Sequence, residues 1–124
     1  MIYLDTHAVI WLYAGLVDQF SNRAKILLNE QDLLISPMVR LELCYMYEIG
    51  RVAADDAAIT ADLAQRIGLR VCGKPFDAIV TRAATLAWTR DPFDRIIVAH
   101  AALGNHYLLS KDRVILQHYP HAIW

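Results

Sequence analysis

Short apolar runs alternate with longer segments of helical character along this chain, and this alternation restricts the fold more than any other feature of the sequence. The runs are far shorter than a helix, and we predict strands at residues 2–5, 32–36, 69–72 and 106–110, with 122–124 as a last edge strand. Strands that are joined through helices need crossover connections, which place the strands side by side in a parallel arrangement. The sequence therefore predicts an α/β domain whose central, mainly parallel sheet is covered by helices on both faces.

The segments between these runs contain residues that start and end helices. Ser21 and Ser36 are N-cap candidates, and the proline after Ser36 suits the first helical position. Asp55 or Asp56 starts a further helix, for which Gly68 is a suitable C-cap. The predicted helices cover residues 7–14, 22–30, 37–50, 57–68, 76–88 and 93–104. The last two predicted helices both begin at a Pro-Phe-Asp tripeptide. This tripeptide is typical of a helix start and alone says little about function.

The length and composition fit a single domain over residues 1–124. Hydrophobic residues make up 56% of the chain and charged residues 20%, which excludes a disordered chain. The formal net charge of −1 does not indicate a nucleic-acid binder, so contact with phosphate has to come from local basic residues or bound cations. Cys44 and Cys72 form no C-x-x-C pair and are expected to be reduced core residues.

The same composition bears on location and assembly. The sequence shows no basic leader with an apolar core, and no apolar stretch approaches the roughly 20 residues of a membrane span, so we expect a cytoplasmic domain. The apolar content, with Trp11, Tyr13, Tyr45 and Tyr47 on or near the early helices, suggests surface reserved for partners. We expect a homodimer, although the same aromatic residues also fit a role in the core.

Two acidic residues follow predicted strands. Asp5 ends the first strand and Asp112 lies just beyond the fourth, so a parallel sheet places both at the edge where open α/β sheets bind ligands. Taken singly, Asp5 is also explained as a helix cap and Asp112 as a turn residue.

Glu42 lies in the middle of an apolar helix stripe. At about 100° per residue it shares a face with four apolar residues, Met38, Leu41, Tyr45 and Ile49. A glutamate on a buried face is costly unless it is protonated, paired or bound to a metal, and this favours a functional role for Glu42. The alternatives are a less buried helix or pairing with an arginine.

Two aspartates flank the start of the helix predicted after Pro92. Asp91 precedes the proline and is predicted to cap the helix. Asp94 is predicted to project into the core on the side of Val98 and Ala101, which favours a chemical role; its alternative is a favourable charge near the helix N-terminus. Asp77, at the equivalent place in the preceding helix, is expected to have only that second role.

These observations together predict a metal site built from Asp5, Glu42, Asp94 and Asp112. Four carboxylates suit a hard cation, Mg²⁺ or Mn²⁺, with Asp5 and Asp94 expected as metal ligands. Two carboxylates about 5 Å apart repel by roughly 3 kcal/mol at an effective dielectric of 20, so the cluster needs cations. Such cations activate water and stabilise charge on a phosphodiester, and they allow an acidic site to bind a polyanion.

Five basic residues are close in sequence to these acids: Arg40, Arg90, Arg95, Lys111 and Arg113. They are candidates for holding flanking phosphates. For Arg40 and Arg95, pairing with a carboxylate of the site is the alternative.

Four segments together resemble the PIN-domain family, and in particular the VapC-type toxins of bacterial toxin–antitoxin pairs. These are YLDTH, ISPMVRLEL, WTRDPFDRIIVAHA and LLSKD, which follow the family's order across essentially the whole chain. The resemblance implies a three-layer α/β/α fold of the RNase H-like or 5′-nuclease type. It also implies a Mg²⁺- or Mn²⁺-dependent endoribonuclease that is inhibited by a cognate antitoxin. The family's acidic residues correspond to Asp5, Glu42, Asp94 and Asp112, whereas His7 departs from the small residue that the family often has.

Two further functions compete with a metal-dependent ribonuclease. A non-catalytic PIN-like module that binds RNA or protein is the main alternative, and the presence of all four acids favours the enzyme. A phosphoryl-transfer enzyme acting on small substrates is the second, and the absence of a D-x-D motif after the first strand counts against it.

Overall fold

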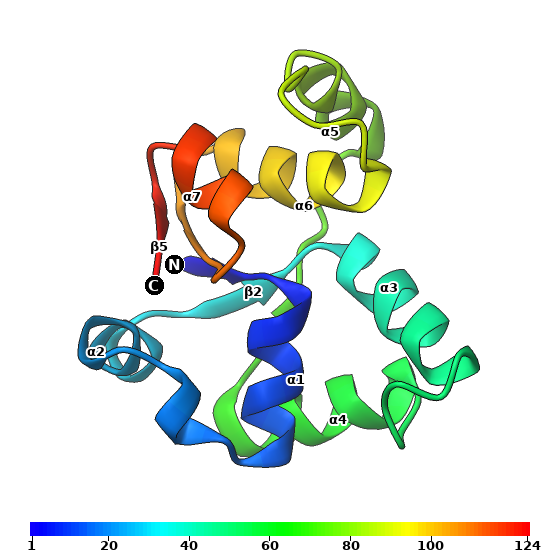
Figure 1. Ribbon diagram of the computed structural model, residues 1–124, viewed down its shortest axis with the longest axis vertical. Helices are drawn as coiled ribbons and strands as arrows, with labels where there is room; N and C mark the ends of the chain where they lie inside the picture. Colours follow the sequence, from blue (N-terminus) through cyan, green and yellow to red (C-terminus); the bar gives the residue numbers. More distant parts are fainter.

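Five short parallel strands form the central sheet of the computed structural model, which describes residues 1–124 (Figure 1). Their order is β3-β2-β1-β4-β5, and every neighbouring pair is parallel. The strands are β1 (Ile2–Leu4), β2 (Leu33–Ile35), β3 (Arg70–Val71), β4 (Tyr107–Leu109) and β5 (Ala122–Ile123). Each lies within one of the predicted apolar runs, and β5 is an edge strand as expected.

Seven α-helices connect the strands, and most begin at the predicted caps. They are α1 (Thr6–Ala14), α2 (Asn22–Glu30), α3 (Pro37–Glu48), α4 (Asp56–Ile67), α5 (Phe76–Ala83), α6 (Pro92–Ala102) and α7 (Arg113–His118), with a short 3-10 helix at Val17–Gln19. Ser21 and Ser36 accept hydrogen bonds from first-turn N–H groups, and Gly68 ends α4 with a positive φ of 72°. None of the helices has both the length and the apolar character that a membrane crossing requires.

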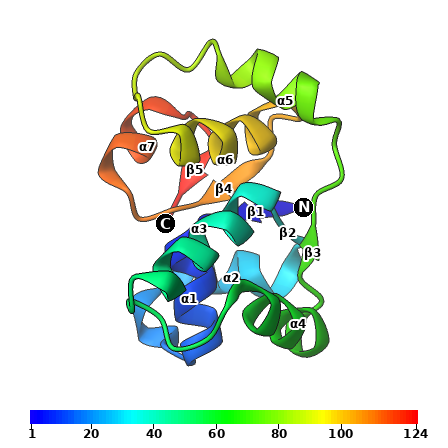
Figure 2. The same ribbon diagram turned by 90° about the vertical axis from the view of Figure 1, so that its right-hand side faces the viewer.

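The helices lie on both faces of the sheet, which confirms the three-layer α/β/α architecture (Figures 1 and 2). The chain first winds from β1 through β2 to β3, with α1, α2 and α4 on one face. It then returns to β4, beside β1, and α5, α6 and α7 lie on the other face. Helix α3 follows β2 and packs against both α4 and α6.

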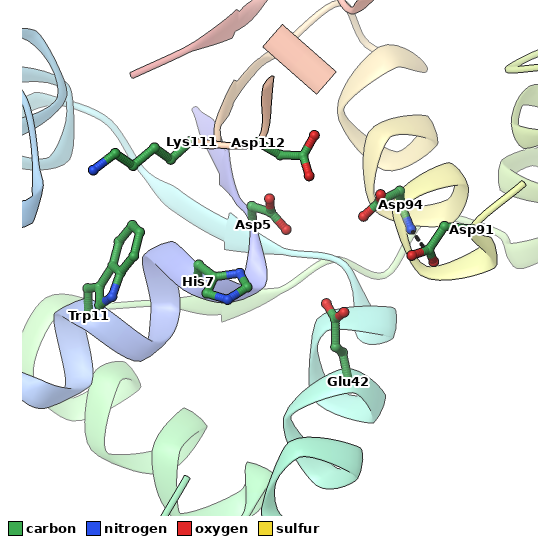
Figure 3. A pocket seen from close by; sticks show the side chains of 8 residues that line it. All are labelled: Asp5, His7, Trp11, Glu42, Asp91, Asp94, Lys111 and Asp112. Atoms are coloured by element: carbon green, nitrogen blue, oxygen red, sulfur yellow. Dashed lines mark hydrogen bonds between the residues drawn. The ribbon is translucent and has the colours of Figure 1, made fainter. Parts of the chain in front are cut away.

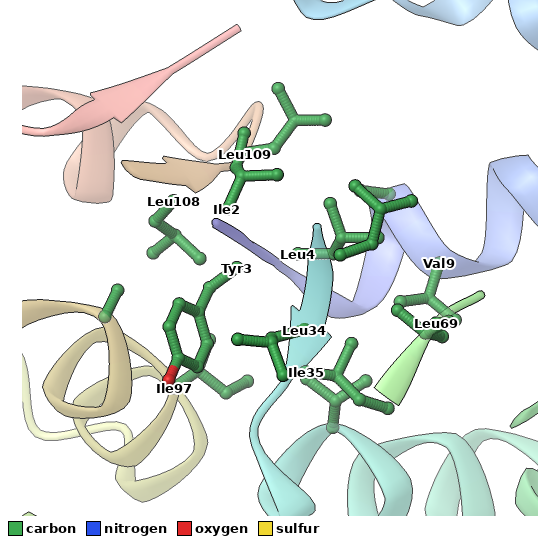
Figure 4. Packing of buried hydrophobic residues seen from close by; sticks show 14 of the residues in the cluster. Ile2, Tyr3, Leu4, Val9, Leu34, Ile35, Leu69, Ile97, Leu108 and Leu109 are labelled. Atoms are coloured by element: carbon green, nitrogen blue, oxygen red, sulfur yellow. The ribbon is translucent and has the colours of Figure 1, made fainter. Parts of the chain in front are cut away.

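The hydrophobic core lies on both sides of the inner strands (Figure 4). Ile2, Leu4, Leu108 and Leu109 are fully buried, because helices cover the two faces toward which successive side chains point. Each such side chain contributes about 1.5–3 kcal/mol to folding when it leaves water. The core therefore holds β1 and β4 in register, with Leu4 opposite Leu109.

Two helices differ from the sequence prediction. Helix α7 was not predicted, because its six residues are too few to show a periodic pattern. Helix α5 ends at Ala83 instead of continuing to residue 88. The guanidinium of Arg95 in α6 donates hydrogen bonds to the carbonyls of Ala83 and Ala84, at 3.1 and 3.2 Å. This tertiary contact satisfies carbonyls at the end of α5, where sequence propensity alone would extend the helix.

Candidate active site

A pocket of about 420 Å³ opens at the carboxyl ends of β1 and β4. The connections from these two neighbouring strands run to opposite faces of the sheet, so the pocket lies at the switch point where such sheets bind ligands. Eight residues line it: Asp5, His7, Trp11, Glu42, Asp91, Asp94, Lys111 and Asp112 (Figure 3). The structure therefore brings all four predicted acids to one pocket and adds a fifth.

Asp5 is the most buried of these carboxylates, with 7% of its surface exposed. One oxygen accepts the backbone N–H of Thr6 at 2.7 Å, which makes Asp5 the N-cap of α1, and the other accepts the hydroxyl of Ser110 at 2.6 Å. Burial raises the pKa of Asp5, and the hydrogen bonds from Ser110 and Thr6 oppose that rise. Its capping role and its place in the pocket are therefore compatible.

Asp112 is both an N-cap and a pocket residue. Its Oδ1 accepts the N–H groups of Val114 and Ile115, at 2.9 and 3.0 Å, which starts the unpredicted helix α7. The hydroxyl of Ser110 accepts the Asp112 N–H at 3.1 Å while donating to Asp5. Ser110, which the sequence analysis missed, thus connects two acids of the site. The only signal for it was its position at the end of a strand, two residues before Asp112.

Glu42 reaches the pocket from α3, but not for the predicted reason. The core-facing residues of α3 are Val39 and Leu43, whereas the predicted stripe partners Leu41 and Tyr45 are 56% and 52% exposed. Helix α3 has apolar residues on two sides, and the hydrophobic periodicity of the sequence pointed to the exposed side as the core face. Glu42 is half-buried at the border of the true core face, where the hydroxyl of Thr6 donates to its Oε1.

The electrostatic environment of Glu42 is also unfavourable to charge. Burial raises its pKa, the bond from Thr6 lowers it, and the neighbouring Asp5 and Asp91 raise it further. No arginine or lysine forms an ion pair with Glu42, so the alternative of a structural pair is wrong.

Asp91 and Asp94 differ as predicted in their hydrogen bonds, although Asp91 also lines the pocket. The Oδ1 of Asp91 accepts the N–H groups of Phe93 and Asp94, at 2.8 and 3.4 Å, which confirms it as the N-cap of α6. The carboxylate of Asp94 accepts no hydrogen bond from the protein and is half-buried at the pocket wall, instead of entering the core beside Val98. Asp77 is exposed and lies outside the pocket.

Asp94 has the most strongly altered acidity of the half-buried groups. Burial, as the largest cause, and the charges of four neighbouring carboxylates together raise its pKa to about 7; these carboxylates are Asp91, Asp5, Asp112 and Glu42. Such a carboxylate has a strong need for a cation near neutral pH.

The pocket acids have no cationic partner. The ion pairs of the chain join Arg40 to Asp56, Arg66 to Asp62 and Arg70 to Asp32, all away from the pocket. No lysine or arginine therefore forms an ion pair with the acids at the carboxyl ends of β1 and β4, although Lys111 lines the same pocket.

The basic residues near these acids in sequence mostly serve elsewhere. Arg40 pairs with Asp56, and Arg95 and Arg90 donate to backbone carbonyls, Arg90 to that of Ala87. Arg95 forms no ion pair with a carboxylate of the site, and its guanidinium instead joins α6 to the end of α5. Arg113 lies outside the pocket, and Lys111 alone of the five lines it.

The donor set suits a hard divalent cation held partly by water. The pocket offers five carboxylates and no cysteine, and carboxylate oxygens are the ligands that Mg²⁺ and Mn²⁺ prefer. No three His, Cys, Asp or Glu side chains converge closely enough to form a complete ligand set. The pocket carboxylates thus form no complete ligand set by themselves, and a hard cation here would need water among its ligands, as Mg²⁺ commonly has in proteins.

Comparison with known proteins places this site in a family. The model of the PIN domain matches residues 2–120 of the chain. No curated protein matches the sequence significantly.

Several solved structures share the fold at low sequence identity. VapBC2 from Rickettsia felis, bound to a promoter DNA fragment, is 20% identical with a TM-score of 0.68, covering 99% of this chain and 96% of that chain. A toxin–antitoxin complex from Klebsiella pneumoniae is 17% identical with a TM-score of 0.69, covering 100% and 97%. DNA-bound VapBC from Salmonella typhimurium is 18% identical with a TM-score of 0.65, covering 98% and 93%. Because the family match extends over nearly the whole length and the fold agrees, the chain belongs to the PIN-domain family.

Proposed function

We propose that this PIN domain is a Mg²⁺- or Mn²⁺-dependent endoribonuclease that acts as the toxin of a toxin–antitoxin pair. The observation that carries the proposal is a pocket of five carboxylates that form no ion pair with a lysine or arginine, and in which the pKa of Asp94 is raised to about 7. An acidic pocket of this kind gains a function when divalent cations occupy it, and a phosphodiester is a substrate that such cations attract.

Asp5 and Asp94 are the proposed metal ligands. They come from β1–α1 and from α6, and their carboxylates face the pocket from two sides (Figure 3). A bound Mg²⁺ or Mn²⁺ would supply an activated water and neutralise charge on the phosphodiester.

The remaining polar groups prepare and orient this site. The hydroxyl of Ser110 fixes one oxygen of Asp5, and the hydroxyl of Thr6 fixes one oxygen of Glu42. Glu42 and Asp112 extend the negative surface on opposite sides of Asp5, and their free carboxylate lone pairs could accept a proton from a water in the pocket.

The decisive experiment is RNA hydrolysis by the purified protein. We expect cleavage with Mg²⁺ or Mn²⁺ and none with EDTA. Asp94→Asn and Asp5→Asn should abolish it, because each removes a proposed ligand charge, whereas Asp77→Asn, at the matching place in α5 and outside the pocket, should cleave as wild type does. Undiminished cleavage by Asp94→Asn would exclude this residue from the site. RNA binding by wild type without any cleavage would favour the non-catalytic module.

A cognate antitoxin and a second copy of the chain are the proposed protein partners. Exposed aromatic residues support this: Tyr13 on α1 and Tyr45 and Tyr47 on α3 are 37%, 52% and 46% exposed. Tyr13 also lines an apolar pocket of about 260 Å³, together with Ile10 and Ile59 among others. The similarity to the fold of VapBC complexes is consistent with such partners.

A further inference from the structure

The two ends of the pocket differ in chemistry. Figure 3 shows Asp91, Asp94 and Glu42 on one side, Asp5 and Asp112 in the middle, and His7, Trp11 and Lys111 on the other side. The proposed metal chemistry uses the acids alone. It leaves unexplained why an indole, an imidazole and an ammonium group form the remaining wall.

Lys111 is held away from the neighbouring acids. Its side chain diverges from that of Asp112, and its Nζ lies 5.6 Å from the ring centroid of Trp11 and 5.9 Å from that of Trp124 (Figure 3). Both distances are within the range of cation–π attraction. The ammonium makes no ion pair and no hydrogen bond with the protein, so its three donors are available to an anion.

Trp11 is fixed in place by other aromatic rings. It meets Trp124 at 5.4 Å and Phe20 at 6.2 Å, with interplanar angles of 70° and 86°. Phe20 is buried and stacks on Trp124 at 4.9 Å, which anchors the group to the core. Trp11 remains only partly buried and forms part of the pocket wall. The exposed ring of His7 lies 5.8 Å from it, tilted by 49°.

We propose that this end of the pocket is a nucleotide subsite, in which Lys111 contacts the phosphate next to the scissile one and the Trp11 indole, with His7 beside it, stacks on an unpaired base. The inference rests on the proposed function and extends it to the adjacent nucleotide. A ligand that spans the pocket needs a phosphate at the acidic end, where cations bind it, and a second anion with a flat apolar group at the other. One RNA dinucleotide step has these groups in that order.

The subsite selects for RNA that is unpaired at this position. A base in a duplex has both faces covered by neighbouring bases, whereas a base in a loop offers a face to an aromatic side chain. The protein should therefore cleave within loops or single strands, next to the nucleotide that occupies the subsite.

The test couples changes in the protein with changes in the RNA. A fluorescent RNA with one mapped cleavage site is made in versions that carry a single abasic nucleotide at each of the positions flanking the scissile bond. Affinity is measured by anisotropy with Ca²⁺ in place of Mg²⁺, and cleavage is measured with Mg²⁺. We expect one abasic position to weaken binding to wild type by about tenfold and to change the affinity of Trp11→Leu by less than about twofold. Trp11→Phe, which keeps an aromatic face, should retain most of the wild-type sensitivity.

Matched controls separate this role from stability. Trp88→Leu removes an indole that stacks on His118 outside the pocket, and it should keep the full sensitivity to the abasic position. Lys111→Met should reduce the slope of log affinity against log salt by about 0.7, whereas Arg23→Met, which removes an exposed charge on α2 outside the pocket, should leave the slope unchanged.

The outcomes distinguish the subsite from the proposed function. If the abasic substitutions affect wild type and Trp11→Leu equally, or Lys111→Met keeps the wild-type salt slope, the subsite is overturned while cleavage by wild type still supports the nuclease. If wild type binds RNA but cleaves none, the nuclease proposal fails, and the abasic nucleotide is instead moved through every position of a bound oligonucleotide; a position that weakens binding to wild type but not to Trp11→Leu supports the subsite, and the lack of any such position overturns it. Should Trp11→Leu not fold by circular dichroism, His7→Ala, at an exposed side chain, takes its place, with a reduced sensitivity to the abasic position expected.

Discussion

Asp94 is the residue at which protonation, stability and metal binding are most directly linked. Its carboxylate has no hydrogen-bond donor from the protein, and burial with four neighbouring carboxylates raises its pKa to about 7. At a pH below its ordinary value it is neutral in the folded and unfolded chains alike. As the pH rises, Asp94 ionises first in the unfolded chain, whereas in the folded chain it stays mostly protonated until about pH 7. Stability from this group is therefore complete in acid and lost through neutral pH.

We accordingly expect the free energy of unfolding of the metal-free protein to fall between about pH 4 and 7, the interval between the ordinary and the raised pKa of Asp94. Discounted for solvent screening of a half-exposed group, the part due to Asp94 amounts to about 1–2 kcal/mol. Urea unfolding in EDTA across this range measures it. Asp94→Asn should show a shallower fall, with a residual slope from Asp5 and Glu42, whose pKa values are also raised. Asp77→Asn should follow wild type. A stability that rises over this range would contradict the linkage.

The start of helix α6 combines two functions that different substitutions separate. Asp91 caps the helix through Oδ1 and contributes a charge to the pocket. Asp91→Ala removes both, whereas Asp91→Asn keeps an effective cap and removes only the charge. We expect the alanine variant to be less stable than the asparagine variant by about 1 kcal/mol in denaturant unfolding. Metal-dependent cleavage should be the same in the two, and unequal cleavage at equal stability would show that the cap itself shapes the site.

At the scale of the whole molecule, divalent cations should act as stabilising ligands of the folded state. A cation that binds only the folded chain at about 100 times its dissociation constant adds roughly 2.7 kcal/mol. We expect the wild-type melting temperature to rise when Mg²⁺ or Mn²⁺ replaces EDTA. Asp94→Asn should melt above wild type in EDTA, because it relieves repulsion without removing a hydrogen bond, and should respond little to the cations. If it melts below wild type without metal, the carboxylate has a structural partner and the cluster argument fails.

Assembly is a second property of the whole molecule. The exposed aromatic residues of α1 and α3 support a homodimer and an adjacent groove for an antitoxin segment. Sedimentation at micromolar concentration should show a dimer that Tyr45→Ser weakens, since Tyr45 is 52% exposed and its side chain makes no hydrogen bond. Ile26→Ser, at an exposed apolar residue on α2, is the matched control. A monodisperse monomer that does not bind the product of a neighbouring antitoxin gene would defeat both proposals.

The sequence by itself determined the parallel sheet, the order of the strands along the chain and all the α-helices between them except the short α7. These follow from local signals: apolar runs, serine and aspartate caps, and prolines at first helical positions, all of which act over a few residues. Asp5 and Asp112 were predictable as neighbours, because parallel strands end at one edge. The capping role of Asp91 was predictable from Pro92 alone.

Only the tertiary structure decided which faces are buried and which groups meet. Helix α3 is apolar on two sides, so packing against its neighbours, and not periodicity, made Val39 and Leu43 its core residues. Arg95 ends α5 through contacts across two helices. Ser110, Lys111 and Trp11 are far apart or unremarkable in sequence, and they join the acids because the sheet brings the ends of β1 and β4 together. Local sequence signals determine where helices and strands begin and end. A pocket between two strand ends depends on contacts between residues far apart in the chain, which no local pattern shows.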